Sequence, residues 1–423
     1  MPSRDPVAEI VAYNKPLTER AERVEGEGGR DLTAEALRRK LEALTTSPFR
    51  FFRGTFHLMA RDLLEDRIPG GKAAAPDALI VGDLHLENFG VYRGASGALV
   101  FDVNDFDDVG YGPCDVDVKR LCASAFLLPG LAHGQRLAAA RAIAKGWADA
   151  VERIGARFPV RAFTDDKGEG PLHALLAEHG KRTQEEMIAK ATASKARDRF
   201  AESGSPPKIA RVSKAWQAAL EKAAVAYGES LKRLKCEWEG KFQLLDAVYR
   251  FKGTGSLGRL RFSLLLDHDG DRSIVEIKEA RPSVLDEVRG LAPPPNRAAV
   301  QTAAIRRMQG DPWPRVAATS LAGSSALGRE QQPEEEKIAS DQFAAGAGDK
   351  DHAELDSYAA QCGEVLARMH CRASAPQLLD VDWKPHEAAR AAVEFAERYA
   401  EQVEADQQTF LKHRDDVTKA LGL

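Results

Sequence analysis

The feature that most constrains the fold of this chain is its hydrophobic period, which alternates repeatedly between helical and β spacing along 423 residues. Residues 1–78 and about 115–240 place apolar side chains at helical spacing, as in the stretch RLAAARAIAKGWADAVERI. Residues 78–103 and 244–278 instead carry short apolar runs around glycine-bearing turns, a pattern typical of strands. We therefore expect an α+β fold, with a small antiparallel β lobe and a large, mainly helical lobe.

The length of the chain exceeds the size at which one hydrophobic core keeps growing, so two or three lobes and a cleft between them are expected. The changes of period predict a helical lobe over 1–240, a β-rich lobe over 241–335, and helices over 336–423 that complete the large lobe. Within the β-rich lobe we expect a helix near 296–309 and two weaker strands around 315–329.

Composition and charge argue against several classes of protein. The chain is 43% hydrophobic and 29% charged, and its net charge of -4 gives no general attraction to nucleic acid or to an anionic membrane. Its five cysteines are scattered without CxxC spacing, so neither a disulfide framework nor a zinc site is expected. The N-terminus lacks the apolar region of a signal peptide, and no uninterrupted apolar stretch approaches the length of a membrane helix. We expect a cytoplasmic protein without nucleic-acid or membrane partners.

A polar cluster, VGDLHLENFG at 81–90, is followed by the acidic hairpin VFDVNDFDD. Phosphoryl transfer requires a carboxylate that orients or deprotonates the acceptor, and oxygen ligands that hold magnesium against the phosphates. Asp83, Asn88 and one aspartate of the hairpin supply these groups. The hairpin offers Asp102, Asp105, Asp107 and Asp108. A metallophosphoesterase, which also begins with G-D-x-H, needs a later G-N-H/D motif that this chain lacks, and a solvated acidic hairpin is the remaining alternative.

A second motif lies in the clearest β-region, where FKGTGSLGRLRF precedes IVEIKEA. Strands flank its glycines on both sides, which favours a kinase-type phosphate loop over a dinucleotide-binding turn. Lys278 ends the second strand, where its ammonium could meet the α- and β-phosphates of ATP; a lysine at the end of an exposed strand is the alternative. The residues predicted to cover the nucleotide are Gly253, Thr254, Gly255, Ser256 and Gly258.

The pattern D-x-H-x-x-N, followed about twenty residues later by a strand-borne Asp, resembles the catalytic and metal-binding loops of the protein-kinase-like fold. The resemblance is strongest to its aminoglycoside and choline kinase branch. It implies that Asp83 is the catalytic base and Asn88 a magnesium ligand. Counting back from the second glycine of GYGPC selects Asp105 over Asp102 as the other metal ligand. Asp117 matches the structural aspartate that opens the following helix.

The order of these motifs differs from that of a kinase, in which the glycine loop comes first and the catalytic loop later. Here the catalytic loop lies at 83 and the glycine loop at 253. The stretch GEVLARMHCRA at 363–373 resembles the helix that ordinarily precedes the catalytic loop, yet it leads to the C-terminal tail. A circular permutation reconciles these observations, because a chain can be cut and rejoined where termini lie close on a surface.

The whole chain resembles the bacterial proteins of domain-of-unknown-function family 2252. The stretches that carry this resemblance are, in order, SPFRFFRGT, GDLHLENFG, VFDVNDFDDVGYGPCDVDVKRLCAS, KGTGSLGRLRF, VEIKEARPSVL and VLARMHCRA. Two features depart from the small-molecule kinases: Val81 replaces the histidine before G-D, and the helix expected to supply a glutamate partner for Lys278 contains no acid. Glu287 is the nearest acidic candidate for that partner, and Gln301 a neutral substitute.

These motifs predict an ATP- and Mg²⁺-dependent phosphotransferase acting on an unidentified small molecule or protein. Nucleotidyl transfer (AMPylation) on the same fold and a non-catalytic nucleotide-binding pseudokinase are the alternatives. We interpret His85 as a residue that braces the catalytic loop. Arg50 and Arg53 either hold a substrate phosphate or carboxylate or serve as capping and salt-bridge residues.

Overall fold

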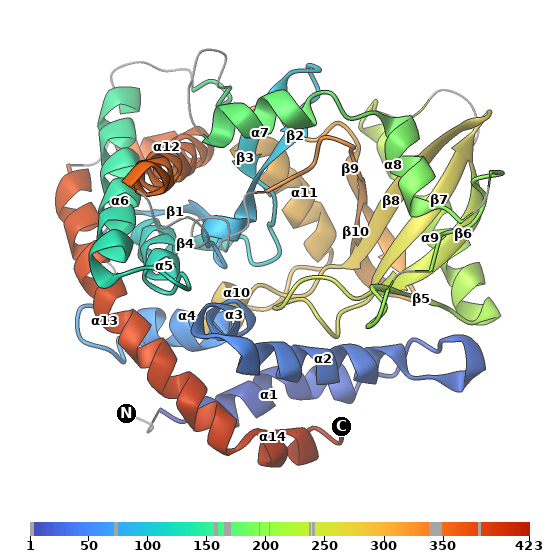
Figure 1. Ribbon diagram of the computed structural model, residues 1–423, viewed down its shortest axis with the longest axis horizontal. Coiled ribbons are helices and arrows are strands. Elements are labelled where there is room, and N and C mark those ends of the chain that lie inside the picture. Colours follow the sequence, from blue (N-terminus) through green and yellow to red (C-terminus); the bar gives the residue numbers. More distant parts are fainter. Residues whose placement is uncertain are drawn as a thin grey trace.

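A computed structural model describes residues 4–71, 75–155, 160–164, 171–193, 195–202, 204–236, 238, 242–337, 349–379 and 382–423. Figure 1 shows a mainly helical half and a sheet half, with two short strand pairs between them and the N-terminal helices α1 and α2 along one edge. The expected α+β class is therefore confirmed within the described residues.

The N-terminal segment is helical, and its helix starts are fixed by side-chain caps. The carboxylates of Asp5 and Asp31 and the hydroxyl of Ser47 accept hydrogen bonds from backbone N–H groups in the first turns that follow them. The helices are α1 (Pro6–Thr18), α2 (Leu32–Thr46), α3 (Pro48–Gly54) and α4 (Phe56–Leu64). A 3-10 turn at Glu27–Gly29 precedes α2.

Two strand pairs lie at the centre of the molecule (Figure 1). Strand β1 (Asp77–Ile80) pairs antiparallel with β4 (Gly110–Pro113), and β2 (Phe89–Arg93) forms a hairpin with β3 (Leu99–Val103). A 3-10 turn at Leu86–Asn88 leads into β2. Helix α5 (Asp115–Phe126) follows β4, and all of its residues are buried, including the charged ones.

The helical half packs around the central strands. Its helices are α6 (His133–Gly155), α7 (Pro171–His179), α12 (Asp349–Leu379), α13 (Pro385–Lys412) and α14 (Arg414–Ala420). Helices α6 and α12 approach so closely that a side chain at Gly363 would overlap the carbonyl oxygen of Ile143. Buried apolar residues from these helices and from the central strands form one continuous core.

The sheet half contains, among the described residues, a six-stranded antiparallel sheet with the order β5-β6-β7-β8-β10-β9. Its strands are β5 (Ile209–Arg211), β6 (Phe242–Arg250), β7 (Arg261–His268), β8 (Asp271–Glu279), β9 (Val316–Leu321) and β10 (Ser324–Glu330). The accompanying helices are α8 (Gln184–Ala191), α9 (Lys214–Arg233), α10 (Val284–Val288) and α11 (Arg297–Met308).

Strand alternation gives the two faces of this sheet different chemistry. On β8, Val275 and Ile277 pack into the core beneath α9, which also contains Phe262 of β7. Glu276 and Lys278 point to the opposite face and line a large cavity. One face of the sheet thus packs on a hydrophobic core, whereas the other carries both charged cavity residues and a smaller apolar cluster with Val248, Leu265 and Ile274.

The predicted helix near 296–309 and the two strands around 315–329 are confirmed as α11, β9 and β10. The pairing of β1 with β4, and of β5 with β6, was not expected from the sequence. The expected lobe boundary between residues 240 and 241 lies outside the described residues.

All five cysteines are free thiols in this structure. The sequence predicted no disulfide framework. None of the helices in the described ranges combines the length and the apolar character needed to cross a membrane.

The contact between α6 and α12 predicts a large effect for Gly363→Ala. The added methyl group meets the Ile143 carbonyl, which belongs to helix backbone and cannot move aside without separating the helices. We expect the free energy of unfolding, measured by urea denaturation, to fall by about 1 to 3 kcal/mol. Gly134→Ala, in a part of α6 where a methyl group meets nothing, should be neutral or slightly stabilising. Equal stability of the two variants would contradict this packing.

Candidate active site

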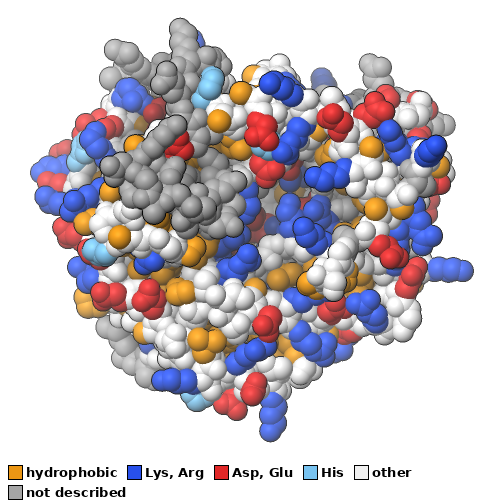
Figure 2. Space-filling model, viewed as in Figure 1, with side chains coloured by type: hydrophobic (Ala, Val, Ile, Leu, Met, Phe, Trp, Pro, Cys, Tyr) orange, Lys and Arg blue, Asp and Glu red, His pale blue; other side chains and the backbone are white. Residues whose placement is uncertain are grey.

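Between the charged face of the sheet and the central strands lies a cavity of about 1020 Å³, which we call the main cavity. Figure 2 shows lysine and arginine side chains gathered in a hollow on this face of the molecule. A second space of about 50 Å³, the inner cavity, lies beneath the glycine-bearing turn between β6 and β7. The two share residues of the predicted site, including Asp105, Gly253 and Thr254. Segments that are far apart in the sequence therefore surround one space.

The loop after β1, residues 81–88, is held in place by two helices. The Asp117 carboxylate, in the first turn of α5, accepts hydrogen bonds from the backbone N–H groups of Val81 (2.7 Å) and Gly82 (2.8 Å). His370 of α12 lies 3.0 Å from the same carboxylate, and the Tyr358 hydroxyl of α12 donates to the Leu86 carbonyl (2.9 Å). Asp117 thus has the structural role predicted for it, and the loop conformation depends on both helices.

Asp83 lines the inner cavity, and the side-chain hydrogen bonds that it accepts from the described residues go to one of its oxygens, Oδ1. Arg120 donates to Asp83 Oδ1 from Nε (2.9 Å) and Nη2 (2.5 Å), and its guanidinium stacks on the rings of Phe52 and Phe56. The other oxygen, Oδ2, faces Gly255, where a β-carbon would lie 3.6 Å away. Burial raises the pKa of Asp83 to about 6, against the attraction of Arg120. At neutral pH this carboxylate has one oxygen available to accept a proton.

Asn88 and Asp105, the two predicted metal ligands, both line the main cavity. The Asn88 side chain is buried, and within the described residues its Oδ1 atom has no hydrogen-bond partner. A buried amide oxygen without a partner is a suitable ligand for a hard cation such as Mg²⁺. Asp102 instead turns away from the cavity and accepts a hydrogen bond from the Gly310 N–H (3.1 Å). The geometry therefore favours Asp105 over Asp102.

No group of three or more His, Cys, Asp or Glu residues with metal-binding geometry occurs in the part of the chain that the structure describes. A cation here would be held by few protein ligands and by oxygens of a bound phosphate. Magnesium commonly binds in this way, since it retains several waters or phosphate oxygens.

Lys278 extends from β8 across the cavity to the acidic loop. Its Nζ lies 2.5 Å from Asp107 Oδ2 and 3.6 Å from Asp105 Oδ1, and Arg259 also binds Asp107 (2.9 Å). Burial opposes ionisation of Asp107, but Lys278 and Arg259 lower its pKa to about 2. Desolvation and the neighbouring Asp107 charge raise the pKa of Asp105. The pair is thus asymmetric, with Asp107 firmly ionised.

The sequence left the partner of Lys278 open, with Glu287 and Gln301 as candidates, and neither is the partner in the structure. Its ion pairs are with the two loop aspartates, not with Glu287, which lies in α10, or with Gln301 of α11. Gln301 instead donates from Nε2 to the backbone carbonyl of Asp107 (3.1 Å). Asp107 and Asp105, not a residue of α11, are thus the acidic partners of Lys278 in this structure.

The glycine-bearing turn lies over Asp83. Gly253 and Gly258 have φ of +83° and +93°, and a β-carbon at Gly255 would lie 2.9 Å from the Arg53 carbonyl oxygen. Gly253, Thr254, Gly255 and Ser256 line the cavities. Gly258 lies outside the lining and packs on α2, where a β-carbon would come within 2.6 Å of Leu37. Its role is to seat the turn on the N-terminal helices.

Arg53 braces the loop, which agrees with the salt-bridge alternative for this residue. It donates from Nε to His85 Nε2 (3.0 Å) and pairs with Glu87 (2.5 Å), which also binds Lys337 (2.7 Å). Burial and the charge of Arg53 lower the pKa of His85 well below its usual value, so His85 is neutral and accepts this hydrogen bond. Arg50 is exposed and lines the main cavity.

Three charged residues of the site were not identified from the sequence: Arg120, Asp107 in its pairing role, and Arg259. Amphipathic spacing assigns a charged helical residue to solvent, whereas α5 is enclosed on all sides. The four charged residues of DVDVKR, directly after a strand, were the available signal. They indicate a helix start at which charges serve the neighbouring loop.

Residues 32–413 match the family described as "Uncharacterized protein conserved in bacteria (DUF2252)", and the chain belongs to this family. No curated protein and no solved structure matches the chain.

Arg120→Gln should raise the pKa of Asp83. Arg120 opposes burial and the neighbouring aspartates, which both raise the pKa of Asp83. Without the guanidinium we expect this pKa to rise by about 1 to 3 above its value near 6. Carboxyl-carbon NMR titration of the variants measures this directly, with Asp83→Asn identifying the signal. Arg120→Lys, which keeps the charge, should give a smaller rise. An unchanged Asp83 pKa in Arg120→Gln would show that Arg120 does not set its ionisation.

Proposed function

We propose that this member of the DUF2252 family is an ATP- and magnesium-dependent phosphotransferase with a circularly permuted protein-kinase-like fold. The observation that carries the proposal is the convergence of three segments on one space. Lys278 of the sheet lies 3.6 Å from Asp105 of the acidic loop, and the glycine-bearing turn closes over Asp83. These are the parts that kinases bring together around the phosphates of ATP.

The arrangement of the sheet supports the kinase-like part of the proposal. The glycine-bearing turn joins β6 and β7, Lys278 lies on the next strand, β8, and helix α11 follows it. Protein kinases place the glycine-rich loop, the lysine strand and a helix in the same succession.

The permutation is supported by the position of α12. Its C-terminal part contains residues 363–373, which resemble the helix that precedes a kinase catalytic loop. Ser374, directly after them, accepts a hydrogen bond at Oγ from the Leu79 N–H of β1 (2.9 Å). His370 lies against Asp117, which holds the loop. This helix therefore adjoins the start of the catalytic loop in space, although it lies near the other end of the chain.

Each residue then has a definite task. Lys278 exchanges its carboxylate partners for the α- and β-phosphates, and backbone N–H groups of the glycine-bearing turn cover the phosphate tail. Asn88 and Asp105 would hold magnesium, which when bound neutralises charge on the phosphates. Arg120 keeps Asp83 Oδ1 fixed so that Oδ2 faces the acceptor.

The transfer step balances with these groups. The acceptor hydroxyl oxygen forms a bond to the γ-phosphorus, and the bond between that phosphorus and the β,γ-bridging oxygen breaks, so ADP leaves with the electron pair. The acceptor proton passes to Asp83 Oδ2. A pKa near 6 keeps Asp83 mostly ionised at pH 7 yet basic enough to accept the proton.

Two substitutions separate binding from transfer. Lys278→Met should weaken binding of a magnesium–ATP analogue by about tenfold to a hundredfold in calorimetry, because a phosphate contact to a charged group is lost. Asp83→Asn should bind within about threefold of the wild type but transfer at least about a hundredfold more slowly. Lys145→Met, which removes an exposed lysine from α6, is the matched control.

Labelled ATP distinguishes the reactions. Transfer of label from the γ-phosphate to an acceptor is expected, and transfer from the α-phosphate would replace phosphoryl by nucleotidyl transfer. Full activity of Asp83→Asn would show that Asp83 is not the catalytic base. Binding of ATP without turnover across a broad panel of acceptors would identify a pseudokinase.

The rate should depend on pH through Asp83. Protonation removes the base, so kcat/KM should fall by about tenfold per pH unit below a midpoint near 6, and level off above it. In Arg120→Gln the midpoint should move to higher pH. A midpoint near 4, the ordinary value for aspartate, would mean that an exposed carboxylate is the base.

A further inference from the structure

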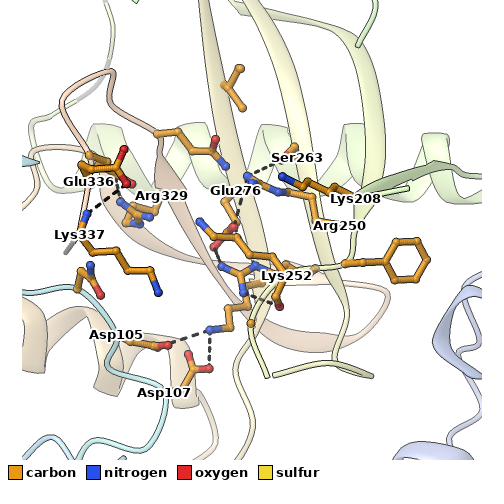
Figure 3. A pocket seen from close by; sticks show the side chains of 18 of the residues that line it. Asp105, Asp107, Lys208, Arg250, Lys252, Ser263, Glu276, Arg329, Glu336 and Lys337 are labelled. Carbon is orange, nitrogen blue, oxygen red and sulfur yellow. Dashed lines mark hydrogen bonds and ion pairs between the residues drawn. The ribbon is translucent and has the colours of Figure 1, made fainter. Parts of the chain in front are cut away.

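The wall of the main cavity that belongs to the sheet carries an unusual group of positive charges, which we call the sheet-face cations. They come from the end of β6, the glycine-bearing turn, the start of β7 and the end of β10: Arg250, Lys252, Arg261 and Arg329. In Figure 3 the labelled members of this group surround Glu276 within the pocket, some distance from the Asp105–Asp107 end.

The carboxylates that face these cations do not balance them. Glu276 binds Arg261 through both oxygens (2.9 Å each) and lies 3.9 Å from Arg250. Glu335 pairs with Arg329. Lys252 has no ion pair within 4.0 Å among the described residues, and its side chain is open to the cavity. The wall therefore carries a surplus of positive charge in a protein whose net charge is -4.

Hydrogen bonds to one backbone carbonyl and two serine hydroxyls hold two of these cations in place. Arg261 donates from Nη1 to the Lys252 carbonyl (3.2 Å) and to Ser256 Oγ (3.2 Å), which fixes the base of the turn, and Arg250 donates to Ser263 Oγ (3.3 Å). Desolvation, together with the charges of Arg261 and Arg250, lowers the pKa of Lys252 to about 8 despite the attraction of Glu276. An anion beside these groups would relieve their mutual repulsion.

The chemistry of this wall selects its ligand. The groups on this wall are guanidinium and ammonium groups, and Arg250 and Lys252 both line the main cavity. Phosphate oxygens accept charge-assisted hydrogen bonds from such groups.

We propose that Arg250, Lys252, Arg261 and Arg329 form a second anion subsite, which binds a phosphate group at the sheet-face end of the main cavity. Glu276 and Lys278 are two residues apart on one face of β8, which separates this subsite from the Lys278 site by about 7 Å. The existence of the subsite follows from the cavity alone. Its place in a reaction rests on the proposed function, where its phosphate comes either from the nucleotide tail or from a phosphorylated acceptor.

Calorimetry with inorganic tripolyphosphate, without nucleotide or metal, tests the subsite. The wild type should bind this probe, and Lys252→Met should weaken binding by at least about tenfold, while Lys252→Arg restores most of it. Lys145→Met, on the exposed surface of α6, should bind as the wild type does. Unchanged binding in Lys252→Met, or no binding by the wild type, would overturn the proposal.

A second titration identifies the source of the phosphate. If the nucleotide tail occupies the subsite, Lys252→Met weakens magnesium–ATP binding but not AMP binding. If a phosphorylated acceptor occupies it, Lys252→Met leaves magnesium–ATP binding unchanged. Either result supports the subsite. The first titration needs neither ATP nor turnover. The subsite can therefore be confirmed even if the protein is not a phosphotransferase, and it can be refuted even if the protein is one.

Discussion

The ion pairs of Lys278 with Asp107 and Asp105 join the sheet half to the acidic loop, and the rest of the site depends on them. All three residues line the main cavity, so the pairs bridge it from the sheet to the loop. Removing one partner of such a buried pair leaves an uncompensated charge and costs about 3 to 5 kcal/mol. Under the proposed function, phosphate oxygens replace the carboxylates at Lys278, and Arg259 still pairs with Asp107.

The site separates its carboxylates by their surroundings. Asp107, between Lys278 and Arg259, has its pKa lowered to about 2, whereas burial raises that of Asp83 to about 6. Such a separation assigns fixed charge to one carboxylate and proton transfer to the other. Asn88 Oδ1, which has no hydrogen-bond partner among the described residues, adds a neutral candidate ligand for a cation in the lining of the same cavity. These features together favour chemistry on a phosphorylated ligand over a purely structural acidic hairpin.

Sequence reasoning identified what depends on local spacing. The alternation along β8, the positive-φ glycines of the turn and the loop from Asp83 to Asn88 are encoded within a few residues. It did not identify what depends on enclosure: Arg120 is buried because α5 is packed on every side, and Asp107 pairs with Lys278 because a loop and a strand meet across the cavity. Gly258 is a further example, because the fold places Leu37 of α2 against it. The sequence around Gly258 could not show that contact.

The most direct test of this account is a crystal structure with a non-hydrolysable ATP analogue and Mn²⁺, in which anomalous scattering locates the metal. The account predicts the metal beside Asn88 Oδ1 and the Asp105 carboxylate, with phosphates at Lys278 beneath the turn that contains Gly255. A metal at Asp102, or a nucleotide bound outside the main cavity, would contradict it.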